Sequence, residues 1–171
     1  DDVKKDKIIA VFKADSIKDL DRKRAKCLDD IDVYAWAVAA NALNPIPGVD
    51  VSVDLTAFYK MAQEIRETFG LDETVIEKYM TVLGPVGKKL ADEVLAYLTK
   101  EGIMWVIKQV AGKYATKQFV KYIPFVGQAV AACAGFAMTK TLGTYYIDNC
   151  FELAKEILEY EVMNNKNEIL K

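Results

Sequence analysis

Apolar residues recur at intervals of three and four along most of the chain, which predicts helices joined by turns that contain proline or glycine. The first long stripe begins at Ile17, and Ser16 is suited to cap it. Pro45 should end this helix near Leu43, because a residue before proline avoids the helical backbone conformation. A second helix is then expected after the proline- and glycine-containing turn at residues 44–48. Its apolar positions are Val51, Leu55, Phe58, Ala62, Ile65 and Phe69.

Glycines mark the boundaries of the next predicted helices. Gly70 can end the second helix in the left-handed backbone conformation, with Leu71 packing back and Asp72 capping a helix that should run to about Leu83. Gly102 is then expected to separate the following helix from the one after it. The apolar positions expected for the helix before Gly102 are Val86, Leu90, Val94 and Leu98.

The last long helical region is expected to begin at Pro124 and to carry small residues at a strict spacing of four. These small residues are Gly127, Ala131, Gly135, Thr139 and Gly143. Such a stripe lets the backbone of a neighbouring helix approach closely. Beyond it, apolar positions from Ile147 to Val162 continue an amphipathic pattern up to the polar segment 164–167.

No stretch alternates between apolar and polar residues, so the sequence predicts an all-α protein. We expect a multi-helix bundle built on two helical hairpins, each punctuated by proline and glycine. With 171 residues and 52% hydrophobic content, the chain has enough apolar side chains for the core of a single helical domain over residues 1–171.

Charge and cysteine content restrict the classes of function. The formal net charge is only −2, so nucleic acid is not an expected partner. Three widely spaced cysteines, Cys27, Cys133 and Cys150, predict reduced and mostly buried thiols in a reducing compartment. No apolar segment of a signal peptide follows the N-terminal residues, so we expect a cytoplasmic location, and the abrupt start is typical of a fragment.

Catalytic chemistry has little support in the sequence. The chain contains no histidine, which excludes Ser-His and Cys-His nucleophile pairs. Residues 84–89 superficially resemble a phosphate-binding loop, but two residues rather than four separate the glycines and no Ser or Thr follows the lysine. An acidic group around Glu64, Glu67, Asp72 and Glu73 is interpreted as a solvated helix end rather than a metal site. We therefore expect no catalytic, cofactor-binding or metal-binding residues, and no enzymatic activity, in this chain.

One segment departs from the balanced charge of the chain. Residues 100–122 contain five lysines against one glutamate, a net charge of +4, beside an apolar side that includes Trp105, Val106 and Val110. A basic amphipathic helix of this kind is typical of peripheral contact with an anionic membrane. In the alternative interpretation, Trp105 and Val110 belong to the core and the lysines form a solvated face. The candidate membrane-contact residues are Trp105, Lys108, Lys113, Lys117 and Lys121.

Several segments carry a resemblance to a known family. They are Asn-Pro-Ile-Pro-Gly-Val-Asp at residues 44–50, Phe-Gly-Leu-Asp at 69–72, Asp-Arg-Lys-Arg at 21–24 followed by Leu28, and Tyr-Ile-Pro-Phe-Val-Gly at 122–127. Together they resemble the C-terminal helical domain of the immunity-related (interferon-inducible) GTPases. A bacterial helical domain of unknown function, found behind some GTPase domains, has similar helices.

The resemblance implies a helical domain of a dynamin-like large GTPase, separated here from its nucleotide-binding domain. In the family this domain packs beside the nucleotide-binding domain of the same protein and assists association with intracellular membranes in cell-autonomous innate immunity. GTP and Mg²⁺ would then bind to the full-length parent protein. The resemblance leaves open whether that protein forms oligomers.

Two alternatives remain open at the level of sequence. The first is an integral membrane hairpin of the bacterial type, although the apolar run between Lys121 and Lys140 is short of the roughly 20 strongly apolar residues of a span. The second is a free-standing helical adaptor.

Overall fold

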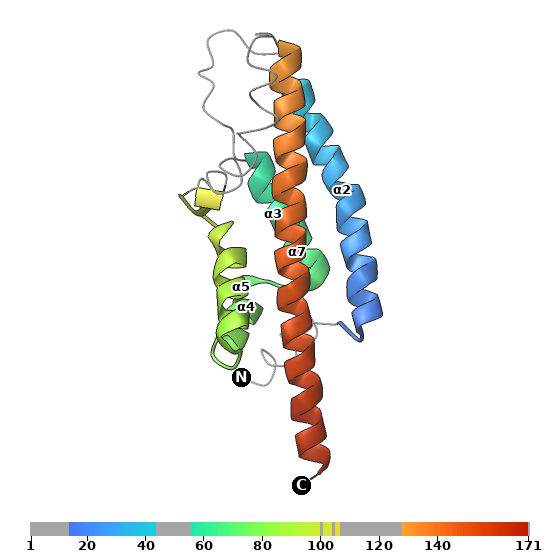
Figure 1. The fold of residues 1–171 in the computed structure, drawn as a ribbon, viewed down its shortest axis with the longest axis vertical. Helices are drawn as coiled ribbons and strands as arrows, with labels where there is room; N and C mark the ends of the chain where they lie inside the picture. Colours follow the sequence, from blue (N-terminus) through green and yellow to red (C-terminus); the bar gives the residue numbers. More distant parts are fainter. Residues whose placement is uncertain (1–13, 44–55, 100, 104, 107–127, 171) are drawn as a thin grey trace. The chain divides into compact units, whose positions relative to one another are not determined.

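In the described residues of the computed structural model, every regular element is a helix (Figure 1). The backbone is described for residues 14–43, 56–99, 101–103, 105–106 and 128–170, and side chains for these residues except 38–43, 56–57, 128–136 and 138. The labelled helices are α2 (Ile17–Leu43), α3 (Thr56–Phe69), α4 (Glu73–Met80), α5 (Pro85–Ala96) and α7 (Gln128–Ile169). The all-α prediction is confirmed, whereas both predicted hairpin turns, at 44–48 and 122–127, lie outside the described residues.

The start of α2 follows from local backbone chemistry. At its start, the amide of Asp19 donates a hydrogen bond to the Ser16 hydroxyl at 3.2 Å, so that one amide of the first turn is satisfied. The Asp19 carboxylate lies 3.2 Å from the Lys23 ammonium group, one turn along the helix. At the other end, α2 is described as far as Leu43, and the predicted stop before Pro45 lies outside the described residues.

The junction between α3 and α4 is formed by three consecutive residues. Gly70 has a φ of 68°, a conformation that costs residues with a Cβ about 1–2 kcal/mol. Its amide donates to the Glu67 carbonyl at 3.1 Å, and the Leu71 amide donates to the Arg66 carbonyl at 2.8 Å, so α3 ends in a Schellman motif. The Asp72 side chain then accepts from the Val75 amide at 2.8 Å and caps α4. These predicted caps are confirmed, but α4 ends at Met80 instead of near Leu83.

The chain divides into two compact units. Unit 1 comprises residues 1–27, 63–95 and 146–171, and unit 2 comprises residues 28–62 and 96–145. Helices α2, α3 and α7 each contribute residues to both units. The largest fully buried side chains of unit 1 are Tyr146, Phe69, Leu20, Leu71, Ile76, Ile147 and Leu153. Those of unit 2 are Tyr97, Ile31, Met61, Ile103 and Leu142.

In unit 1, the buried face of α5 is shifted from the one that the apolar pattern predicts, although Val94 is buried as expected. Val86 is 65% exposed, while Gly87 and Ala91 are buried on the adjacent face. A Cβ atom at Gly87 would lie only 2.7 Å from the Cβ of Leu83, so the side chain of Leu83 occupies the space that glycine leaves. Close packing at this position therefore selects a small residue, and the predicted stripe through Val86 is wrong at its first position.

In unit 2, the break after α5 precedes Gly102. The turn lies at residues 97–99, and Thr99 begins the next helical turn. The Thr99 hydroxyl accepts from the Gly102 amide at 3.0 Å, and the Thr99 carbonyl accepts from the Ile103 amide at 3.0 Å. A Cβ at Gly102 would collide with the carbonyl oxygen of Ala96. Gly102 is thus needed for close approach inside the new helical turn, and the prediction that it separates two helices is wrong.

Two residues of the predicted small-residue stripe in α7 have described side chains. Thr139 is buried. At Gly143, which has no side chain, Ile31 and Met61 of the same unit pack against the helix backbone. A Cβ on Gly143 would lie 3.1 Å from Ile31 Cγ2 and 3.2 Å from Met61 Sδ. Side chains of α2 and α3 therefore pack closely against Gly143, while the approach of a neighbouring backbone stays a prediction.

In unit 1, α7 extends beyond the point at which the apolar pattern stops. The polar segment 164–167 lies inside the helix, which ends at Ile169. From Val162 to Leu170 every residue is exposed. Helical structure in this segment therefore comes from backbone continuity rather than from burial of an apolar face.

Candidate functional site

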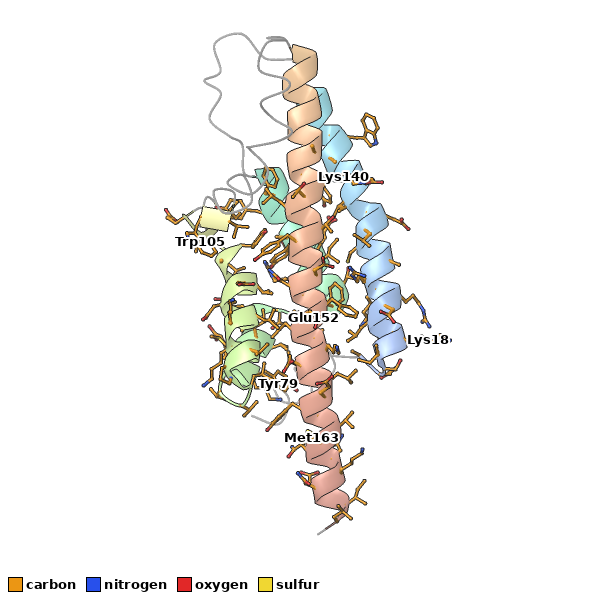
Figure 2. All side chains as sticks on the ribbon, viewed as in Figure 1. Lys18, Tyr79, Trp105, Lys140, Glu152 and Met163 are labelled. Carbon is orange, nitrogen blue, oxygen red and sulfur yellow. The ribbon has the colours of Figure 1, made fainter. Side chains whose placement is uncertain are left out.

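The candidate membrane-contact residue Trp105 lies in a short helical segment whose neighbours are buried. Ile103 and Val106 belong to the core of unit 2, whereas Trp105 is 53% exposed (Figure 2). The start of the segment is held by the hydrogen bonds of Gly102 and Ile103 to Thr99. Side chains three positions apart share a helix face, while one two positions on points away from it. The packing of Ile103 and Val106 therefore directs the indole outward.

This arrangement corrects the expected amphipathic face. The sequence places Trp105 and Val106 on one apolar side, but the structure buries Val106 and exposes Trp105. The alternative interpretation in which Trp105 is a core residue is also wrong. Trp36 on α2, the second tryptophan of the chain, is 67% exposed. Each tryptophan is large enough that its exposure is informative, because large apolar side chains are usually buried.

The lysines of the candidate membrane-contact site are known only from the sequence prediction. Its lysines at positions 108, 113, 117 and 121 lie outside the described residues, as does Val110. Trp105 is therefore the one candidate residue whose surroundings are described. None of the helices in the described parts of the chain is both long and apolar enough to cross a membrane.

A polar relay joins three helices of unit 1. The Arg66 guanidinium donates from Nη1 to the Tyr146 hydroxyl at 3.0 Å, and that hydroxyl donates to the Val94 carbonyl at 3.1 Å. Arg66 lies on α3, Tyr146 on α7 and Val94 on α5. This buried hydroxyl both accepts and donates a hydrogen bond between helices, so we assign the relay to stability rather than chemistry.

The described cysteines do not have the environment of a reactive thiol. Cys27 and Cys150 are both buried, as predicted, while the side chain of Cys133 is outside the described set. Burial raises the pKa of the Cys150 thiol far above its ordinary value, and the nearby Arg66 guanidinium offsets this only in part. Because the thiolate is the nucleophile, a raised pKa makes Cys150 unreactive at neutral pH.

The acidic residues near the α3–α4 junction are engaged in helix-end contacts. Glu67 accepts from the Gln63 side chain at 2.8 Å, and Asp72 caps α4. Within the described residues, no group of three or more His, Cys, Asp or Glu side chains is arranged to hold a metal ion.

At the end of α4, Tyr79 contacts α7 within unit 1 (Figure 2). Its hydroxyl donates to the Glu161 carboxylate, and its ring makes an edge contact with Tyr160 at a centroid distance of 6.2 Å. Burial, followed by the hydrogen bond to Glu161 and the negative charge of that carboxylate, raises the pKa of Tyr79 well above the usual tyrosine value. Tyr79 therefore remains protonated and acts as a hydrogen-bond donor.

No family model matches the chain. No match was found among the curated proteins or the solved structures with which the chain was compared. The fold defines an all-α helical protein, and the described site is an exposed tryptophan on a packed helical turn. Membership of a particular family remains a prediction that rests on the sequence motifs.

Proposed function

We propose that this chain is the helical domain of a large GTPase that resembles the immunity-related GTPases. In this proposal the chain packs beside the nucleotide-binding domain of the same protein and helps to bring it to intracellular membranes. The chain itself performs no catalysis, and GTP with Mg²⁺ binds to the other domain. The motifs at residues 44–50, 69–72 and 122–127 support the assignment, and an all-α fold is compatible with it.

The membrane part of the proposal is carried by the exposure of Trp105. Tryptophan favours the boundary between headgroups and acyl chains, where its ring is apolar and its N–H stays hydrated. About half of the indole is accessible. If that half of a roughly 150–250 Å² side chain is buried at ~25 cal/mol/Å², the upper limit of its contribution is about 2–3 kcal/mol. Each lysine near an anionic surface adds about 1 kcal/mol.

Co-sedimentation with lipid vesicles tests this contact. The 171-residue chain should bind vesicles that contain phosphatidylserine and bind pure phosphatidylcholine vesicles much less. Trp105→Ala should weaken binding, as should the replacement of the four lysines by glutamate. Trp36→Ala is the matched control, because Trp36 is also exposed and belongs to the same unit but lies on α2. Equal loss in both tryptophan variants would contradict a contact specific to Trp105.

Two further observations test the domain assignment. The coding sequence upstream of Asp1 should contain a glycine-rich phosphate-binding loop that ends in Lys-Ser or Lys-Thr. An upstream region without one would refute the assignment to a large GTPase. A chain that can be extracted and kept in solution only with detergent would instead favour a membrane-inserted hairpin.

A further inference from the structure

The turn that joins α4 to α5 in unit 1 can be followed in Figure 1. Its apolar side chains are exposed. Val82 is 44% exposed and Val86 is 65% exposed, and Pro85 between them is exposed as well. We refer to residues 82–86 as the α4–α5 tip.

Packing below the tip holds the two valines outward. The amides of Val82 and Leu83 both donate to the Tyr79 carbonyl, at 3.1 and 3.0 Å, and the Leu83 side chain is buried. On the α5 side, the Lys88 amide donates to the Gly84 carbonyl at 3.0 Å. The exposed valines therefore belong to a hydrogen-bonded turn anchored in the core of unit 1, and their exposure is a property of the fold.

Positive charge borders the tip. Lys78, Lys88 and Lys89 are all exposed, and the sequence from 78 to 91 contains no aspartate or glutamate. The ammonium group of Lys78 lies 5.0 Å from the centre of the Tyr79 ring. Exposed acids begin beyond this interval, at Glu77 and Asp92. Glu161 also reaches the end of α4, where its carboxylate accepts the hydrogen bond from Tyr79.

We propose that the α4–α5 tip is a second contact with an anionic lipid bilayer, separate from the surface around Trp105. Val82, Pro85 and Val86 enter the headgroup region, and the three lysines interact with lipid phosphates and carboxylates. An apolar tip bordered by lysines without intervening acids matches the apolar interior and negative surface of such a bilayer. This inference rests on the proposed function in one respect, namely that the chain works at a membrane surface.

Charge reversal at the tip is the first test. The variant Lys88→Glu/Lys89→Glu should bind vesicles of phosphatidylcholine and phosphatidylserine roughly thirtyfold more weakly than the parent, or worse. The matched control is Lys18→Glu/Lys26→Glu, which changes the net charge equally at two exposed lysines of unit 1 that lie on α2 instead of the tip. The control should bind within about threefold of the parent. Equal loss in both variants would mean that only overall charge matters and would overturn the tip contact.

A tryptophan placed at the tip gives a local readout. In a Trp36→Phe/Trp105→Phe background, Val86→Trp leaves one indole, located at the tip. Its emission should shift to shorter wavelength when phosphatidylserine vesicles are added, because the ring leaves water. Val86 is largely exposed, so the larger ring should be accepted without repacking, and far-ultraviolet circular dichroism checks that helicity is retained.

The outcomes separate the two membrane contacts. If the variant with the single tip tryptophan binds vesicles without a spectral shift, or if Lys88→Glu/Lys89→Glu binds like the parent, the tip contact is overturned and the Trp105 contact is unaffected. If Trp105→Ala binds vesicles like the parent while Lys88→Glu/Lys89→Glu loses binding, the Trp105 contact is overturned and the tip contact is supported. A parent chain that binds no vesicles overturns both contacts, and an acidic protein surface then becomes the occupant to test. The assignment to a large GTPase is tested separately, by the search for a phosphate-binding loop upstream of Asp1.

Discussion

Replacing Tyr146 by phenylalanine should destabilise the fold by about 1–3 kcal/mol. Tyr146 is fully buried in unit 1, where its hydroxyl accepts from Arg66 and donates to the Val94 carbonyl. Val94 lies in the last turn of α5, where carbonyl groups lack a following helical amide. The tyrosine hydroxyl supplies a donor that the helix cannot provide for itself.

The magnitude follows from the two hydrogen bonds that are lost. A neutral hydrogen bond contributes about 0.5–1.5 kcal/mol net, and one to a charged group about 1.5–3 kcal/mol. Arg66 is only partly buried, so water can replace part of its lost contact. In the Tyr146→Phe variant, the Val94 carbonyl has less access to water than Arg66, because the new phenylalanine ring still covers that carbonyl. The unpaired carbonyl should therefore account for most of the cost.

Urea denaturation followed by circular dichroism measures this change as a difference in unfolding free energy. Tyr160→Phe is the matched control, since it preserves the ring contact with Tyr79 and should alter stability by less than about 0.5 kcal/mol. A double-mutant cycle of Tyr146→Phe with Arg66→Gln should show a coupling energy of at least about 0.5 kcal/mol. If Tyr146→Phe matches the Tyr160 control, or if the cycle shows no coupling, the structural role assigned to the relay is wrong.

Two further predictions concern packing and protonation. Gly143→Leu should cost about 1–3 kcal/mol, because even its Cβ would lie 3.1–3.3 Å from Ile31 and Met61, whereas Gly84→Ser, at a position open to solvent, should be nearly neutral in the same denaturation assay. The raised pKa of Tyr79 predicts that stability falls as pH rises above the ordinary tyrosine value of about 10, where the unfolded chain loses a proton that the folded chain retains. Tyr79→Phe should reduce this alkaline loss, and an unchanged pH profile would contradict it.

Local signals in the sequence were sufficient for the class of fold and for several helix ends. Ser16, Gly70 and Asp72 act through hydrogen bonds to residues three or four positions away, and Gly70 adopts its left-handed conformation without help from distant residues. These features depend on backbone chemistry that is complete within one turn, which explains why they could be predicted before any packing was known.

Tertiary structure decided which helix faces are buried. Periodicity favours Val86 as a core residue, but the close approach of Leu83 leaves room only for Gly87, so Val86 turns outward. The same applies to Trp105, since the sequence cannot tell which side of its segment a neighbouring element will cover. The sequence named Trp105 as a candidate membrane contact, but its exposure, and that of Val82 and Val86, could be known only from the tertiary structure.

The polar contacts between helices also required the tertiary structure. Arg24 donates to Asp148 from Nε at 3.0 Å and from Nη2 at 2.6 Å, across 124 residues of sequence, and Tyr79 reaches Glu161 across 82. The sequence by itself determined an all-α chain, with helix ends set by local caps. Which side chains meet was decided by packing of the helices, because a hydrogen bond between distant residues has no periodic or local signature until the chain brings the two groups together.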